Sequence, residues 1–179
     1  NIDPSSIEML CHAIDKKINS PLTSGSGRLF DAVAALINLV PYAKFHAEAP
    51  MRLESAIDKK INTRYPFSIS TTISFENTIR NIIVDLQNKV PLSEISAKFH
   101  NTIISVVTEV VREAREKYNL NIVVLSGGTF QNKYILENLE NLLVKNNFRV
   151  FSHQRVPTND GGIALGQMVI AAKNRYNSA

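Results

Sequence analysis

Apolar side chains recur at intervals of three and four residues along most of the chain, which predicts a helix-rich protein. The pattern predicts helices over about residues 5–19, 28–39, 51–61, 75–89, 93–118, 134–145 and 161–172. In the fifth of these, Glu94 and Lys98 are one turn apart and are placed to pair. On the first, Cys11 shares the apolar face, so we expect it in the core. Phe75, Phe99, Tyr118 and Tyr134 sit at helical spacing with aliphatic residues and are also expected in the core.

Three segments have the composition of strands. Residues 65–73 are rich in β-branched and aromatic side chains, and residues 148–151 form a shorter run of the same kind. Residues 122–125 are all apolar, as expected of a strand buried on both faces. The last third reads strand, glycine turn, helix, strand, turn and helix, which predicts a right-handed α/β unit with its functional edge at the carboxyl ends of the strands. The fold class is therefore α/β, helix-rich, with a small mixed sheet.

Composition narrows the function classes. The chain has 179 residues, of which 44% are hydrophobic, enough for one core and one globular unit. It begins at Asn1 without an initiator Met, so we expect a fragment or a processed chain. The net charge of +4 is spread over scattered Lys and Arg residues, which argues against a nucleic-acid interface. A single cysteine excludes internal disulfides and CxxC zinc sites, and no stretch approaches 18 apolar residues. We expect a cytoplasmic protein without a membrane span.

Three short segments combine glycines with polar side chains close to the start of a predicted helix. They are Ser26-Gly27-Arg28-Leu29-Phe30-Asp31, Ser126-Gly127-Gly128-Thr129-Phe130-Gln131-Asn132 and Asn159-Asp160-Gly161-Gly162. The free backbone N–H groups and the positive dipole at such a helix start favour anions. Three of them in one short chain predict a site for a phosphate-bearing ligand and a metal.

Each of these positions also has a purely structural interpretation. Gly127 and Gly128 let a phosphate approach the backbone, or they simply allow a tight strand-to-helix turn. Asn132, one turn into the predicted helix, contacts a base or phosphate, or it is a surface residue. Asp31 accepts hydrogen bonds from ribose hydroxyls, or it offsets the helix dipole. Arg28 binds a phosphate or is solvated.

Four segments in order, GRLFDAVAAL, AKFHNT, LSGGTFQN and NDGGIALGQ, resemble the C-terminal part of HypF-type carbamoyltransferases, which are maturation proteins of nickel-iron hydrogenases. The resemblance extends from the first helix to about residue 172. It is more distant to tRNA threonylcarbamoyl transferases and antibiotic O-carbamoyltransferases, which share an actin-like (ribonuclease H-like) nucleotide-binding fold. On this resemblance, residues 1–179 are the C-terminal lobe of an actin-like carbamoyltransferase domain.

The resemblance implies an activity and its ligands. The family is thought to make carbamoyl-adenylate from carbamoyl phosphate and ATP and to pass the carbamoyl group to a C-terminal cysteine of a partner protein. The ATP or carbamoyl-adenylate would contact residues of the first two glycine segments: Gly27, Arg28, Asp31, Gly127, Gly128 and Asn132. Asp160 would be one ligand of a divalent metal (Mg, Zn or Fe). The family's H-x-x-x-H metal motif is absent, because the four histidines include no pair four residues apart. Physical reasoning alone gives Asp160 the role of a helix cap.

Two features limit this transfer of roles. At Phe45-His46-Ala47-Glu48 the family usually has an aromatic residue, Glu, Gly and an acid or amide. Ala47 adds a methyl group where a ribose would approach, and His46 removes a carboxylate. His100 matches the family motif, but we interpret it as a hydrogen-bonded structural histidine. Two other functions stay open: a noncatalytic nucleotide-binding or interaction module, and transfer of a carbamoyl or threonylcarbamoyl group to a small molecule or tRNA.

Overall fold

The computed structural model describes residues 3–177, and the side chains of residues 3–176. In chain order the elements are α1 (Pro4–Asp15), α2 (Ser26–Leu36), α3 (Glu48–Ser55), β1 (Ser68–Ile69), β2 (Ile73–Ser74), α4 (Glu76–Gln87), α5 (Leu92–Tyr118), β3 (Ile122–Leu125), the 3₁₀ turn η1 (Gly128–Gln131), α6 (Lys133–Lys145), β4 (Arg149–Ser152), the 3₁₀ turn η2 (Asp160–Gly162) and α7 (Ile163–Asn177). Each predicted helix is present, which confirms the helix-rich pattern. Among the described residues, no helix combines the length and the apolar character that crossing a membrane needs.

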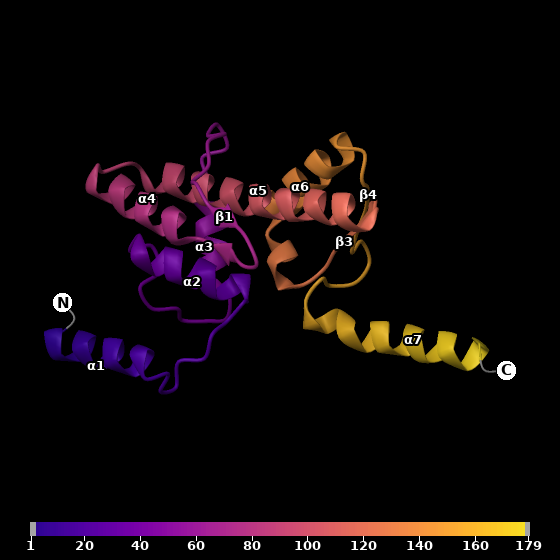
Figure 1. Cartoon of the computed structure of the whole chain (residues 1–179), viewed down its shortest axis with the longest axis horizontal. Helices are drawn as coiled ribbons and strands as arrows, with labels where there is room; N and C mark the ends of the chain where they lie inside the picture. The colour runs from indigo at the N-terminus through magenta and orange to yellow at the C-terminus, as the bar shows by residue number, and fades with distance from the viewer. Residues whose placement is uncertain (1–2, 178–179) are drawn as a thin grey trace.

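The long helix α5 is the centre of the molecule. At one end it packs with α3 and α4 and, through the ring contact of Phe99 with Phe30, with α2; at the other end it packs with α6, which also contacts β4 (Figure 1). Its side chains Ile95, Phe99, Ile103 and Val106 follow the helical repeat and are all buried. One continuous core therefore joins the helical half to the α/β half and includes Phe30, Val33, Leu53, Ile82, Leu125, Ile135, Leu139 and Leu143.

The expectation of a single small mixed sheet is wrong, because the four strands among residues 3–177 form two separate two-stranded sheets. β1 and β2 are antiparallel, with Ile69 opposite Ile73, so the strand predicted over residues 65–73 is instead a short hairpin. The polar residues between the strands form its turn, closed by a hydrogen bond from Ser70 N to Thr72 O of 3.0 Å. β3 and β4 are parallel and are connected through α6, which confirms the predicted strand–helix–strand unit.

The prediction that β3 is buried on both faces is wrong. Val123 and Leu125 point toward the core, whereas Ile122 and Val124 are 58% and 65% exposed. Phe151, the partner of Val124 on β4, is exposed on the same face. Because α6 covers one face of this two-stranded sheet, successive side chains alternate between core and surface.

The two terminal helices lie apart from the core (Figure 1). α1 has no buried residue, so the prediction that Cys11 is a core residue is wrong. The helix also ends earlier than predicted, and the left-handed residues Lys17 and Asn19 follow it. In α7, every side chain from Ile163 to Tyr176 is exposed. Outside these helices, Tyr118 is 60% exposed and is also wrongly predicted as core.

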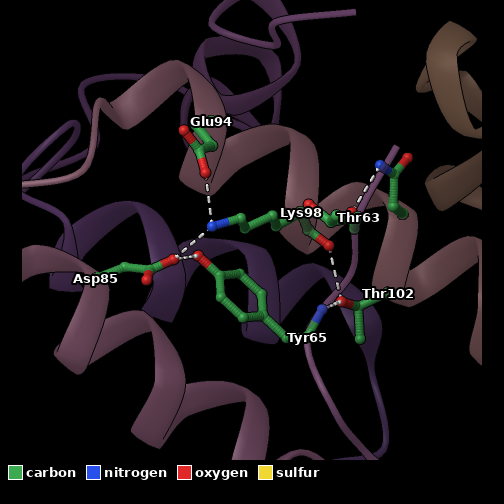
Figure 2. A network of polar contacts seen from close by, with 7 residues as sticks. Thr63, Tyr65, Asp85, Glu94, Lys98 and Thr102 are labelled. Atoms are coloured by element: carbon green, nitrogen blue, oxygen red, sulfur yellow. Dashed lines mark hydrogen bonds and ion pairs between the residues drawn. The ribbon is translucent and has the colours of Figure 1, made fainter. Parts of the chain in front are cut away.

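A network of polar contacts fixes the segment before β1 to α4 and α5 (Figure 2). Lys98 Nζ lies 2.7 Å from Glu94 and 3.1 Å from Asp85, which confirms the predicted Glu94–Lys98 pair. Tyr65 donates its hydroxyl to Asp85 at 2.8 Å, and its backbone N–H to Thr102 Oγ1 at 2.9 Å. Burial disfavours the charge on Lys98, but the bonds to Glu94 and Asp85 outweigh it and raise the Lys98 pKa. The lysine thus stays charged and holds the two carboxylates together.

Candidate functional site

The three glycine segments predicted to bind a ligand meet at the end of β3. Ser26 Oγ, at the start of α2, lies 2.5 Å from Thr129 Oγ1 in the turn after β3. Gly127 N donates to Thr158 O at 2.9 Å, and Thr158 Oγ1 donates to Gly127 O at 3.0 Å. These bonds bring the segments of residues 26–31, 126–132 and 159–162 to the carboxyl edge of the parallel strands. This edge is where open α/β sheets commonly bind ligands.

The turn after β3 depends on glycine and is open on its outer side. Gly127 has φ of +105°, which side-chain-bearing residues rarely adopt. A Cβ added to Gly27 or Gly128 would meet nothing within 4 Å, so a ligand can approach both backbones. The chain then makes the 3₁₀ turn η1 before α6 begins at Lys133. The phosphate-binding geometry expected at the start of a regular helix is thus replaced by a 3₁₀ turn.

The two predicted positions of Asn132, one turn inside a helix or on the surface, are both wrong. It is the N-cap residue of α6, where its side-chain oxygen accepts a hydrogen bond from Ile135 N at 2.9 Å. Its amide nitrogen donates to His100 Nε2 at 3.0 Å, and the residue is buried. Both polar atoms of the Asn132 side chain are therefore engaged, the oxygen in capping α6 and the nitrogen in holding the turn to α5.

His100 is a hydrogen-bonded structural histidine, as predicted. It is fully buried, and its Nδ1 lies 2.8 Å from Ser96 O. A carbonyl only accepts, so Nδ1 carries the proton and Nε2 is left as the acceptor for Asn132. Burial lowers the pKa of His100 to about 4, although the bond to Ser96 opposes this change. The neutral ring thus fixes the orientation of Asn132.

Asp31 and Arg28 lie on the exposed side of α2, one turn apart. Their side chains are 44% and 78% exposed, and the carboxylate lies 3.5 Å from the guanidinium. Asp31 is one turn into α2, in agreement with its predicted position. Both charges are accessible to a ligand beside the open Gly27 backbone.

Asp160 is the first residue of η2 and is exposed, but it is not the cap of that turn. The cap is Asn159, whose Oδ1 accepts a hydrogen bond from Gly161 N at 3.0 Å. Glycine is required at position 162, because a Cβ there would lie 2.7 Å from Pro157 O. Residues 3–177 contain no group of three or more His, Cys, Asp or Glu side chains arranged to hold a metal ion. One carboxylate does not form a divalent metal site, so the residues of this chain do not fit a metal by themselves.

At Phe45-His46-Ala47-Glu48, where the sequence departs from the family pattern, the backbone conformation explains why the family usually has glycine. Ala47 precedes α3 with φ of 62°, in the left-handed region that favours glycine. The next residue, Glu48, is buried and accepts a hydrogen bond from Lys44 N at 2.7 Å. The glycine usual at this position therefore suits the backbone conformation of this turn.

Sequence reasoning did not identify one pair at this edge. Ser126 Oγ lies 3.0 Å from His153 Nε2, and both side chains are exposed. Each residue directly follows one of the two parallel strands. These positions could have predicted the pair, because the carboxyl ends of neighbouring parallel strands meet at one edge of the sheet.

The chain is similar to known proteins in sequence and in fold. Residues 3–167 match the family described as "Carbamoyltransferase, Kae1-like Domain, second subdomain". The chain belongs to this family. It is 29% identical, over 95% of its length, to the probable carbamoyltransferase HypF of Methanocaldococcus jannaschii, of which it covers 23%. It is 33% identical, over 88% of its length, to the carbamoyltransferase HypF of Rhodobacter capsulatus, of which it covers 21%.

Two solved structures share the fold. A full-length HypF in a phosphate- and nucleotide-bound form is 40% identical, with a TM-score of 0.92 over 97% of this chain and 28% of that one. The HypF of T. kodakarensis is 22% identical, with a TM-score of 0.81 over 97% of this chain and 23% of that one. The recognition of the HypF family from four sequence segments is thus confirmed. The chain spans about a fifth to a quarter of the length of the curated relatives that it matches.

Proposed function

We propose that the chain forms one wall of an ATP site in a carbamoyltransferase that acts in nickel-iron hydrogenase maturation. The observation that carries this proposal is the joining of the three glycine segments by the Ser26–Thr129 and Gly127–Thr158 hydrogen bonds. The phosphate- and nucleotide-bound form of a HypF with the same fold supports it. The acceptor would be a cysteine of a hydrogenase maturation partner protein.

The residues of this chain would bind and orient the nucleotide. The open backbones at Gly27, Gly127 and Gly128 would admit its phosphates, Arg28 would offset their charge, and Asp31 would accept hydrogen bonds from the ribose. Bound ATP would supply the adenylyl group that activates a carbamoyl group derived from carbamoyl phosphate. No covalent nucleophile of this chain is needed, so its contribution is positioning.

Asn132 and Asp160 have narrower roles in this proposal. The amide of Asn132 already bonds Ile135 and His100, so its first role is to hold the turn, and a nucleotide contact would compete with these bonds. Asp160 would supply one carboxylate to a divalent metal whose other ligands lie outside this chain. We assign no step to that metal.

Calorimetric titration of the chain with ATP and Mg²⁺ tests the proposal. Asp31→Ala should weaken saturable binding by about tenfold or more, since a hydrogen-bonded charged group contributes about 1.5–3 kcal/mol. The exposed Asp15→Ala variant, at the end of α1, is the matched control and should bind like the unmodified chain. Equal affinity of the Asp31→Ala variant would contradict the proposal. If the folded chain binds no ATP, the same variants are titrated in the longer protein that carries this chain, where equal affinity or absence of ATP binding would contradict it.

A noncatalytic interaction module is the alternative that one observation favours. Ile122, Val124 and Phe151 form an exposed apolar face on the β3–β4 pair, suited to contact another protein surface. This alternative predicts that Asp160→Asn leaves the carbamoyl transfer of any longer protein carrying this chain unchanged. The carbamoyltransferase proposal predicts a large loss. For transfer to tRNA, the scattered basic charge offers no support.

A further inference from the structure

Ser126 and His153 extend the two parallel strands by one residue each. Leu125 pairs with Ser152 in the last rung of the β3–β4 register, and the next rung places Ser126 Oγ 3.0 Å from His153 Nε2. Within residues 3–177, no other hydrogen bond ties either side chain to another element. Both side chains are exposed at the edge where the glycine segments meet. The pair is therefore available to a ligand and is not needed to hold the fold.

We propose that His153 is a positioning residue that directs the Ser126 hydroxyl toward a phosphate group of the bound nucleotide. The proposal rests on the nucleotide site described above. A hydroxyl has one hydrogen and two lone pairs, so its hydrogen is free for a ligand only when the imidazole is the donor. With Nε2–H donating to Ser126 Oγ, the hydroxyl hydrogen points outward and can be donated to a phosphate oxygen.

A bound phosphate selects this direction of the hydrogen bond. Its negative charge attracts the hydroxyl hydrogen and so favours the tautomer of the ring that carries its proton on Nε2. With the ring in its acceptor form, the hydroxyl hydrogen would instead be held by the ring. The site thus offers a phosphate a side-chain donor beside the open backbone of Gly128.

Several charged groups lie on the elements around His153. On α6, Glu140 accepts a hydrogen bond from Ser152, the last residue of β4. Arg155 follows His153 on the same segment, and Asp160 lies in the next turn. Across the site, α2 contributes the Arg28–Asp31 pair. Substituting His153 leaves all of these charges in place.

Three variants separate the roles of the hydroxyl and of the N–H donor. Ser126→Ala removes the hydroxyl, His153→Leu removes the donor, and His153→Gln keeps a neutral N–H donor at a similar reach. His12→Gln, an exposed histidine of α1, is the matched control. Binding of ATP and of inorganic tripolyphosphate is measured calorimetrically at pH 8, and circular dichroism verifies folding.

At pH 8, Ser126→Ala and His153→Leu should each weaken both probes about tenfold, as for a lost hydrogen bond to a charged group. His153→Gln, which keeps an N–H donor, should stay within about threefold of the unmodified chain. Unchanged affinity in Ser126→Ala or His153→Leu would overturn the inference. So would a His153→Gln variant as weak at pH 8 as His153→Leu.

The two probes distinguish failure of this inference from failure of the proposed function. If ATP binds no more tightly than tripolyphosphate while binding still depends on His153, the ATP site is refuted and the phosphate contact is upheld. If ATP is preferred but its binding is independent of His153, the ATP site is upheld and the inference is overturned. If the folded chain binds neither probe, the same variants are compared in the longer protein that carries this chain. There, absence of ATP binding overturns the proposed function, and binding that does not depend on Ser126 and His153 overturns the inference.

Discussion

Acid should destabilise this chain through His100, and replacing that residue should remove the effect. His100 is fully buried with Nδ1 as a donor to Ser96 and Nε2 as an acceptor from Asn132. A proton on Nε2 would place a charge in the core and two donors, Nε2–H and the Asn132 amide, against each other. The perturbation is a change from pH 7 to pH 4.5, applied to the unmodified chain and to His100→Gln.

The size of the effect follows from the pKa. The ordinary value of 6.5 applies to the unfolded chain, and burial lowers it to about 4 in the folded chain. Between these values the unfolded chain binds more protons, so the free energy of unfolding falls as the pH decreases. The contribution is complete above pH 6.5 and is lost as the pH falls toward 4. At about 1.36 kcal/mol per pKa unit, the full loss is about 3 kcal/mol, most of it reached by pH 4.5.

Urea unfolding followed by circular dichroism measures this difference. Between pH 7 and pH 4.5, the unmodified chain should lose about 2–3 kcal/mol more stability than His100→Gln, which has no titrating ring. Carboxylates contribute equally to both chains, so they cancel. His46→Gln removes an exposed histidine and should keep the acid sensitivity of the unmodified chain. If His100→Gln loses as much stability as the unmodified chain, the buried neutral ring is not the acid-sensitive group.

Three further predictions concern other parts of the fold, and urea unfolding tests each of them. Ala47→Gly relieves the left-handed conformation of an alanine and should stabilise the chain by about 0.5–1 kcal/mol. The control Ala56→Gly, at the other end of α3 with φ of −86°, should destabilise the chain by a similar amount. The same sign for both variants would contradict this reasoning. Gly162→Ala places a Cβ 2.7 Å from Pro157 O and should cost about 1–3 kcal/mol, and an unchanged midpoint would show that the turn relaxes freely. Lys98→Met leaves two partly buried carboxylates without their cation and should also cost about 1–3 kcal/mol, so a neutral result would show that the network of Figure 2 contributes little.

The sequence was sufficient for the helices and for the parallel strand–helix–strand unit, because both are encoded in local periodicity. The stripe of Ile95, Phe99, Ile103 and Val106 on α5 is an example, since it repeats with the helix and is fully buried. Helix ends were less predictable. Residues such as Lys17 and Asn19 adopt left-handed conformations after α1, although neither is glycine.

Burial of whole elements was not predictable from the same pattern. The apolar positions of α1 suit a core, yet none is buried, because periodicity identifies a face and not what covers it. β3 shows the same limit, since an all-apolar run does not reveal that one face of the sheet is open. The placement of Asn132 depends on His100, which is 32 residues earlier in the chain, so it too required the tertiary structure.

The departure at Ala47 shows why a glycine pattern needs the backbone before it is interpreted as a ligand contact. From the sequence, the methyl group of Ala47 was considered an obstacle to a ribose. In the structure its φ of 62° alone accounts for a preference for glycine, because an L-residue in this region has its Cβ close to the following carbonyl oxygen. Gly162 is similar, since Pro157 O leaves no room for a Cβ. At Gly27 and Gly128, by contrast, a Cβ would meet no protein atom within 4 Å, and neither backbone has positive φ. Backbone conformation therefore explains the family's preference for glycine at position 47, and packing explains Gly162. Neither reason applies to Gly27 and Gly128, nor to Gly166 in the exposed helix α7, and under the proposed function it is a phosphate of the nucleotide that would occupy the space beside Gly27 and Gly128.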